Sequence, residues 1–149
     1  MALVVEKCPL EEVAERSAGA AWELGSRYSS SVGLGLHRDD AEAMAWYKKG
    51  AIAGDFRAEH NYAVMLQRQE DCAEALLWYE KSATQGNASS DHALGRLFHA
   101  GFQDSSGRRV RDLAKAKAYY TAALKRGWAD AGPDLERLER DLHVLEDHS

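Results

Sequence analysis

The sequence contains little cysteine or proline and no long hydrophobic run. Its two cysteines, Cys8 and Cys72, are isolated, and their spacing fits neither a metal site nor a disulfide framework. No run approaches the 18 or so apolar residues that a membrane-spanning helix needs. The apolar run within the opening residues, MALVVEKCPL, is too short for a secretory signal. These absences predict a protein of the reducing cytoplasm, with a chain trimmed of its leader as the alternative.

Motifs of catalysis and nucleotide binding are missing as well. The sequence has no G-x-S-x-G, H-E-x-x-H, G-x-x-x-x-G-K-[ST] or G-x-G-x-x-G pattern. His92 and His99 are seven residues apart, so on a helix they would lie two turns from each other, too far for one zinc ion. The net charge of −5 argues against general nucleic-acid binding. We therefore expect no cofactor, no metal site and no nucleic-acid partner.

What the chain does contain favours one helical domain. It has 149 residues, of which 45% are hydrophobic and 29% charged, and it is rich in helix-forming residues such as Ala, Leu, Glu and Arg. The charge is unevenly distributed, because the segment from Arg96 to Arg126 carries eight Lys or Arg against two Asp. A basic segment within an acidic chain is a candidate interaction surface.

One fifteen-residue pattern occurs three times. It reads AEAMAWYKKGAIAGD at 41–55, AEALLWYEKSATQGN at 73–87 and AKAKAYYTAALKRGW at 114–128. Each copy follows an Asp suited to cap a helix and contains a Gly suited to end one. Between the Asp and the Gly stands an aromatic pair, at the same distance from both in every copy. The first residue of the pair, including Trp46 and Trp78, is expected in the core. The pattern predicts helices over 40–53, 72–85 and 113–126, the B helices.

A second pattern precedes each of these helices. It reads Ala20-x-x-x-Leu24-Gly25-x-x-Tyr28 in the first copy, and similar letters begin at Ala58 and Ser90. These positions share one side of a helix, and the small residue after the Leu or Tyr marks close approach of another helix. The pattern predicts helices over 18–30, 56–68 and 88–100, the A helices.

Pairing each A helix with the following B helix gives an all-α fold, a right-handed αα-solenoid of three helix-pair repeats. We predict a single domain with repeat one at about 18–55, repeat two at about 56–87, repeat three at about 88–128 and a C-terminal capping helix at about 131–147. The apolar stripe of that capping helix comprises Leu135, Leu138, Leu142 and Leu145. Residues 9–17 either form a short capping helix or extend the first A helix.

These motifs resemble the Sel-one-like repeat family (SLR), a relative of the tetratricopeptide repeat. The resemblance covers about residues 20–128, and repeat one carries it best. The matching residues of that repeat are Leu24, Gly25, Tyr28, Gly33-Leu34-Gly35-Leu36, Asp39, Ala43 and Trp46-Tyr47. Repeat two lacks the glycine connector, and repeat three has a longer connector and Tyr119 in place of Trp.

The resemblance implies a non-catalytic scaffold or adaptor that holds a protein or peptide partner along a curved surface. In bacteria such modules include immunity proteins and secretion or envelope adaptors. Some relatives were described as β-lactamase or penicillin-binding proteins, which makes a hydrolase the alternative. Those relatives carry a cysteine pair in each repeat, and this sequence has none.

The resemblance also indicates where a partner would bind. In helical-pair solenoids the A helices line the concave side, and one column of their residues would face it. That column comprises Trp22, Ser26, His60, Val64, His92, Arg96 and His99. Trp, His and Arg suit peptide contacts. Alternatively, Trp22 packs under an N-terminal capping helix, while Trp128 is expected to pack against the C-terminal one.

The third repeat carries a possible basic patch. Its members are Arg108, Arg109, Arg111 and Lys115, with Lys117 close by in the sequence. The patch could receive an acidic partner, mediate regulatory binding or be ordinary solvated charge. Another possibility is weak self-association, in which it faces the acidic run Glu11, Glu12 and Glu15 of a second copy.

Overall fold

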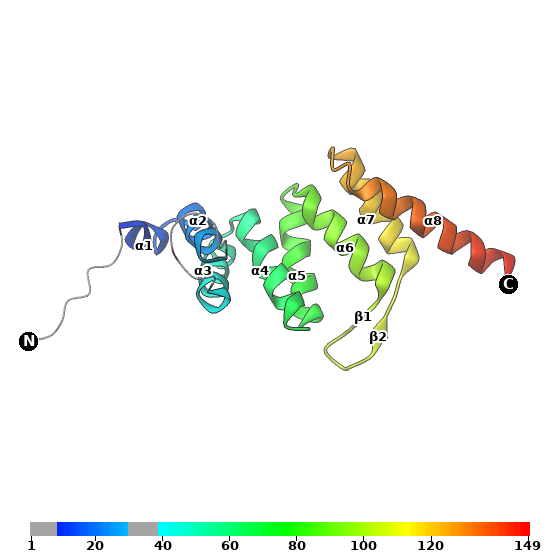
Figure 1. The fold of residues 1–149 in the computed structure, drawn as a ribbon, viewed down its shortest axis with the longest axis horizontal. Coiled ribbons are helices and arrows are strands. Elements are labelled where there is room, and N and C mark those ends of the chain that lie inside the picture. Colours follow the sequence, from blue (N-terminus) through cyan, green and yellow to red (C-terminus); the bar gives the residue numbers. More distant parts are fainter. Residues whose placement is uncertain (1–8, 30–38) are drawn as a thin grey trace, which may run out of the picture.

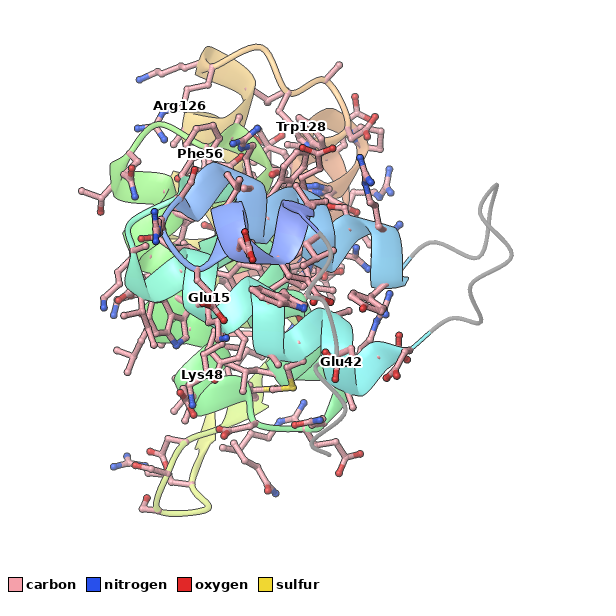
Figure 2. The ribbon with its side chains drawn as sticks, turned by 90° about the vertical axis from the view of Figure 1, so that its left-hand side faces the viewer. Glu15, Glu42, Lys48, Phe56, Arg126 and Trp128 are labelled. Carbon is pink, nitrogen blue, oxygen red and sulfur yellow. The ribbon has the colours of Figure 1, made fainter. Side chains whose placement is uncertain are left out.

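The computed structural model describes residues 9–29 and 39–149, and in that part the chain is an elongated row of helices with one short hairpin (Figure 1). The helices and strands are α1 Pro9–Ala14, α2 Ala18–Ser29, α3 Asp40–Ile52, α4 Phe56–Arg68, α5 Cys72–Thr84, α6 Ala88–Ala100, β1 Phe102–Gln103, β2 Arg109–Val110, α7 Leu113–Lys125 and α8 Ala131–Asp147. Seen along the row, they stack behind one another (Figure 2). The predicted all-α solenoid of helix pairs is confirmed, and each A and B helix ends within one residue of its predicted bound.

The helix starts are set by the repeated aspartates. The carboxylates of Asp39, Asp71 and Asp112 accept hydrogen bonds from backbone N–H groups three residues later, at 3.1, 3.3 and 3.0 Å. These bonds satisfy donors that would otherwise lack a partner in the first helical turn. The glycine after each B helix, such as Gly54, has a positive φ, a left-handed conformation that ends the helix.

In repeats one and three, the second residue of the aromatic pair packs against a glycine inside the A helix. A Cβ atom added at Gly25 would lie 2.6 Å from the Tyr47 ring, and one added at Gly95 would lie 2.5 Å from the Tyr120 ring. Both tyrosines are buried. The close approach of the two helices in these repeats therefore requires a residue without a side chain.

Replacing Gly95 by alanine is expected to lower the free energy of unfolding by about 1–3 kcal/mol, because the added methyl group overlaps the Tyr120 ring. This loss exceeds the gain of up to about 1 kcal/mol that alanine brings to a helix interior. The control is Gly132→Ala in α8, where a Cβ would meet only Leu124 at 3.9 Å. Urea denaturation measures both, and a Gly95→Ala protein as stable as Gly132→Ala would contradict the packing argument.

The first aromatic of each pair varies in burial. Trp46 is buried, as expected, whereas Trp78 and Tyr119 are only half-buried against the main core. The lysine three residues after each tryptophan covers its exposed side, with Lys49 Nζ 4.4 Å from the Trp46 ring centroid and Lys81 Nζ 4.2 Å from that of Trp78. Such cation–π contacts shield the tryptophans on the B helices.

A single helix closes each end of the row. Residues 9–14 form the separate helix α1, and Ala14 packs in a small cluster with Ala21, Leu24 and Trp46. At the other end, α8 buries Leu138 completely, while Leu135 and Leu142 are half-buried. The expectation that Leu145 continues this covered stripe is wrong, because Leu145 is 55% exposed.

The connector of repeat three was expected to be a loop and instead contains a β-hairpin. Strands β1 and β2 pair antiparallel, with Phe102 opposite Val110 and Gln103 opposite Arg109. Phe102 is buried and packs edge-on against Phe98 of α6, which fixes the hairpin to the helix end. The glycine connector Gly33-Leu34-Gly35-Leu36 of repeat one and Cys8 lie outside the described residues.

Across the ranges 9–29 and 39–149, no helix combines the length and the apolar character needed to cross a membrane.

Candidate functional site

Two adjoining cavities run along α6, and we refer to them together as the α6 groove. The first, of about 470 Å³, follows the helix from Ser89 near its start to Gly101 just after its end. It is lined by His60, Val64 and Gln67 of α4, Cys72 and Tyr79 of α5, Ser89, His92, Ala93, Arg96, Leu97 and Ala100 of α6, and Gly101 and Trp128. The wall is thus contributed by two repeats and by the turn before α8.

The second cavity, of about 320 Å³, lies toward the hairpin end of α6 and shares Arg96 and Ala100 with the first. Its lining is Arg96, His99, Ala100, Arg111, Tyr120, Asp134 and Arg137. The turn that carries Trp128 and the hairpin lie at opposite ends of the helices (Figures 1 and 2). The α6 groove therefore extends from a tryptophan at one end to a group of arginines at the other.

The structure brings together five of the seven residues predicted to bind a partner. His60, Val64, His92 and Arg96 line the first cavity, and His99 joins Arg96 in the second. The remaining two residues, Trp22 and Ser26, line neither cavity.

Trp22 and Ser26 are instead engaged within repeat one and its border with repeat two. The Arg57 guanidinium lies 4.1 Å from the Trp22 ring centroid, and Trp22 packs against the main core. Its indole Nε1 is buried and has no hydrogen-bond partner within the described part of the chain. Ser26 Oγ accepts a hydrogen bond from the Tyr47 hydroxyl at 3.3 Å. The small cluster beside α1 contains Trp46 rather than Trp22.

Sequence reasoning missed Trp128 and the residues of α8 that line the α6 groove. Trp128 is 37% exposed, and its indole N–H donates to His92 Nδ1 at 3.1 Å. Asp134 and Arg137 belong to a helix that the sequence places at the offset of a fourth A helix after Gly127 and to which it gives the role of a cap. Extending the predicted partner-binding column into this helix would have included Arg137.

The two histidines of α6 bind the two aspartates of α8. His92 Nε2 lies 2.6 Å from Asp134 Oδ2, and His99 Nε2 lies 2.7 Å from Asp141 Oδ2. Because the Trp128 indole can only donate, His92 Nδ1 accepts and the Nε2 proton faces Asp134. The His99 bond holds the pKa of Asp141 below its usual value. These contacts attach α8 to the wall of the α6 groove.

The bonded chain from Asp141 through His99 to the Tyr120 hydroxyl has the order of a catalytic triad, but its last member is unsuited to attack a substrate. His99 Nδ1 lies 3.2 Å from the hydroxyl, and Tyr120 is only 1% exposed. Burial raises the pKa of Tyr120 to about 12, so the phenol is protonated at neutral pH. The corresponding chain through His92 ends in an indole, which is no nucleophile.

His60 provides an uncharged, hydrogen-bonded surface to the first cavity. Burial lowers the pKa of His60 to about 4, so the ring is neutral at pH 7. Its Nδ1 lies 2.8 Å from Ser90 Oγ, and its ring packs edge-on against Tyr79. In the described residues no group of three His, Cys, Asp or Glu side chains is arranged to hold a metal ion.

Of the four residues of the predicted basic patch, Arg111 alone lines a cavity of the α6 groove. Arg109 donates to the Ala100 carbonyl at 2.8 Å, Arg108 is exposed at the hairpin, and Lys115 Nζ lies 5.2 Å from the Phe98 ring centroid. Self-association of this patch with the acidic residues of α1 stays a prediction.

Comparison with known families matches the Sel1 repeat to three segments of this chain, residues 18–55, 57–87 and 88–128. No curated protein matches the chain. Several solved structures are similar, among them the structures of two Sel1 or SLR proteins. One is a Sel1 repeat protein from Oxalobacter formigenes, with 25% identity and a TM-score of 0.68, covering 83% of this chain and 48% of that one.

The other is a protective antigen of uropathogenic Escherichia coli strains that displays an SLR fold. It has 28% identity and a TM-score of 0.69, and the match covers 82% of this chain and 26% of that one. The chain thus spans half or less of the length of these two proteins.

Proposed function

This chain belongs to the Sel1 repeat family, whose repeats are generally protein–protein interaction modules, and from that membership we propose that it is a non-catalytic scaffold binding a partner polypeptide in the α6 groove. The observation that carries the proposal is the α6 groove itself, an open channel walled by two repeats and α8. The repeated residues have structural roles in the helix pairs, since the aspartates cap helices and the tyrosines Tyr47 and Tyr120 pack on glycines.

The dimensions of the α6 groove fit a short extended peptide. Helix α6 has 13 residues, which gives a length of about 20 Å. An extended chain advances about 3.3 Å per residue, so about six residues would cover the helix. Half-buried Val64 and exposed Trp128 offer apolar contact, while His60, Gln67 and Ser89 offer hydrogen bonds.

The cytoplasm is the proposed location, because a reducing compartment suits a chain whose cysteines are isolated in the sequence.

The test is to fill the α6 groove without disturbing the core. Ala100 is exposed and lines both cavities, so Ala100→Trp would place a large ring in the channel. The matched control is Ala118→Trp, because Ala118 is an alanine of α7 that is also exposed and lines neither cavity. Tagged proteins are incubated with lysate of the source cells, and the proteins bound to each are quantified by mass spectrometry.

We expect a partner that is captured by the wild type and by Ala118→Trp and that falls at least about tenfold with Ala100→Trp. Circular dichroism spectra of the three proteins serve as the check on folding. Equal capture by the two tryptophan variants would place the binding surface elsewhere.

A further inference from the structure

Three arginines from three different elements line the second cavity of the α6 groove. Arg96 comes from α6, Arg111 follows the hairpin strand β2, and Arg137 comes from α8. Their mutual proximity also appears in their electrostatic effects. The positive charges of Arg96 and Arg137 both act on Tyr120, and those of Arg111 and Arg137 both act on Asp141.

These arginines are incompletely paired. Within residues 9–29 and 39–149, neither Arg96 nor Arg111 forms an ion pair. Arg111 Nε donates to the His99 carbonyl at 2.8 Å, which positions the side chain and leaves its two Nη groups available. Arg137 Nη1 lies 3.8 Å from Asp134 Oδ1, too far for a hydrogen bond. Several N–H donors therefore face this cavity without an acceptor.

The nearby carboxylates are already engaged with histidines. Asp134, which lines the same cavity, binds His92 through Oδ2 at 2.6 Å, and Asp141 binds His99 at 2.7 Å. Of these two aspartates only Asp134 lines the cavity, so its single negative charge stands against three guanidinium groups. The second cavity keeps an excess of positive charge in a chain whose net charge is −5.

On the basis of the proposed function, we propose that the α6 groove selects an extended acidic segment, whose carboxylates bind Arg96, Arg111 and Arg137 and whose preceding or following apolar side chain packs against Trp128. Guanidinium groups form forked hydrogen bonds with carboxylates, and a cluster of three provides both charge and direction. The apolar contact at the opposite end fixes the segment along α6. Three arginines from three elements match several acidic side chains, whereas a chain terminus supplies a single carboxylate.

The experiment uses a random library of eight-residue peptides displayed with a free C terminus and selected on the full chain. We expect enriched peptides to contain Asp or Glu at two or more clustered positions. One enriched peptide is then synthesised with Gln and Asn replacing its acidic residues, and separately with an amidated C terminus. Fluorescence anisotropy is expected to give at least about a tenfold larger Kd for the peptide with Gln and Asn, and a Kd within about twofold for the amidated peptide. A loss of binding on amidation alone would overturn the assignment to acidic side chains.

The matching protein variants are Arg96→Gln with Arg111→Gln, and the control is Arg140→Gln, an exposed arginine of α8 that lines neither cavity. We expect the double variant to raise the Kd of the acidic peptide about tenfold or more and the control to leave it within about twofold. Raising the salt concentration should weaken binding of the acidic peptide to the wild type and reduce the ratio between the Kd values of the double variant and the wild type.

If the enriched peptides contain no acidic residues, and the Ala100→Trp protein does not bind them, the acidic selectivity is overturned and the scaffold proposal stays intact. Failure to enrich any peptide that depends on the α6 groove would also overturn the selectivity, while the lysate comparison of Ala100→Trp with Ala118→Trp judges the scaffold proposal separately. Equal binding by the double variant and Arg140→Gln would show that the carboxylates bind elsewhere.

Discussion

Replacing Trp46 by alanine is expected to lower the free energy of unfolding by about 3–5 kcal/mol. Trp46 is only 7% exposed and packs with Ala14, Ala21 and Leu24, so one side chain joins α1, α2 and α3. Its removal leaves a cavity between these three helices, which cannot collapse far enough to fill the space. In a short array of repeats, weakening one unit also weakens its interface with the next.

Urea denaturation followed by circular dichroism gives the difference, and Leu77→Ala is the control. Leu77 is exposed on α5, and its truncation should change stability by less than about 1 kcal/mol. A Trp46→Ala protein within about 1 kcal/mol of the wild type would mean that the cluster beneath α1 adds little to the fold.

Replacing Leu138 by aspartate is expected to release α8 and lower the free energy of unfolding by about 4 kcal/mol or more. Leu138 is completely buried, and a carboxylate in its place would be charged and without a partner. Releasing α8 uncovers the apolar surface of α7 and separates His92 from Asp134. The exposed surface should also cause association of the protein.

The matched control is Leu145→Asp, further along α8, because Leu145 is 55% exposed. Leu145→Asp should stay within about 0.5 kcal/mol of the wild type and remain monodisperse if the wild type is so. Denaturation and light scattering compare the two proteins. Similar behaviour of both would contradict the capping role of α8.

Helix positions followed from the sequence because their causes are local. An aspartate caps the first turn, a glycine takes the left-handed conformation after the last, and each acts within a few residues of itself. The glycine–tyrosine contacts were also predictable as close approach, since both residues recur at fixed offsets. The turn after α4 has no such glycine, and Glu70 takes the positive φ there.

The site was less predictable because periodicity tells which residues share a helix face, not which neighbour covers that face. Trp22 and His60 occupy equivalent positions, yet Arg57 covers Trp22 while His60 lines a cavity. The hairpin was missed because it depends on Phe102 packing against Phe98 and not on a strong local strand signal. Arg137 was missed because the sequence pattern of α8 was fully accounted for by a capping role, so no binding role was sought in that helix.

The equal spacing of the two histidine–aspartate pairs has a mechanical consequence. His92 and His99 are seven residues apart, as are Asp134 and Asp141, so the two bonds hold α6 and α8 at one mutual position along their axes. Sliding either helix by a single turn would break both bonds together. The α6–α8 wall of the second cavity is therefore in place before a partner binds, and the entropy lost there on complex formation falls mainly on the partner chain.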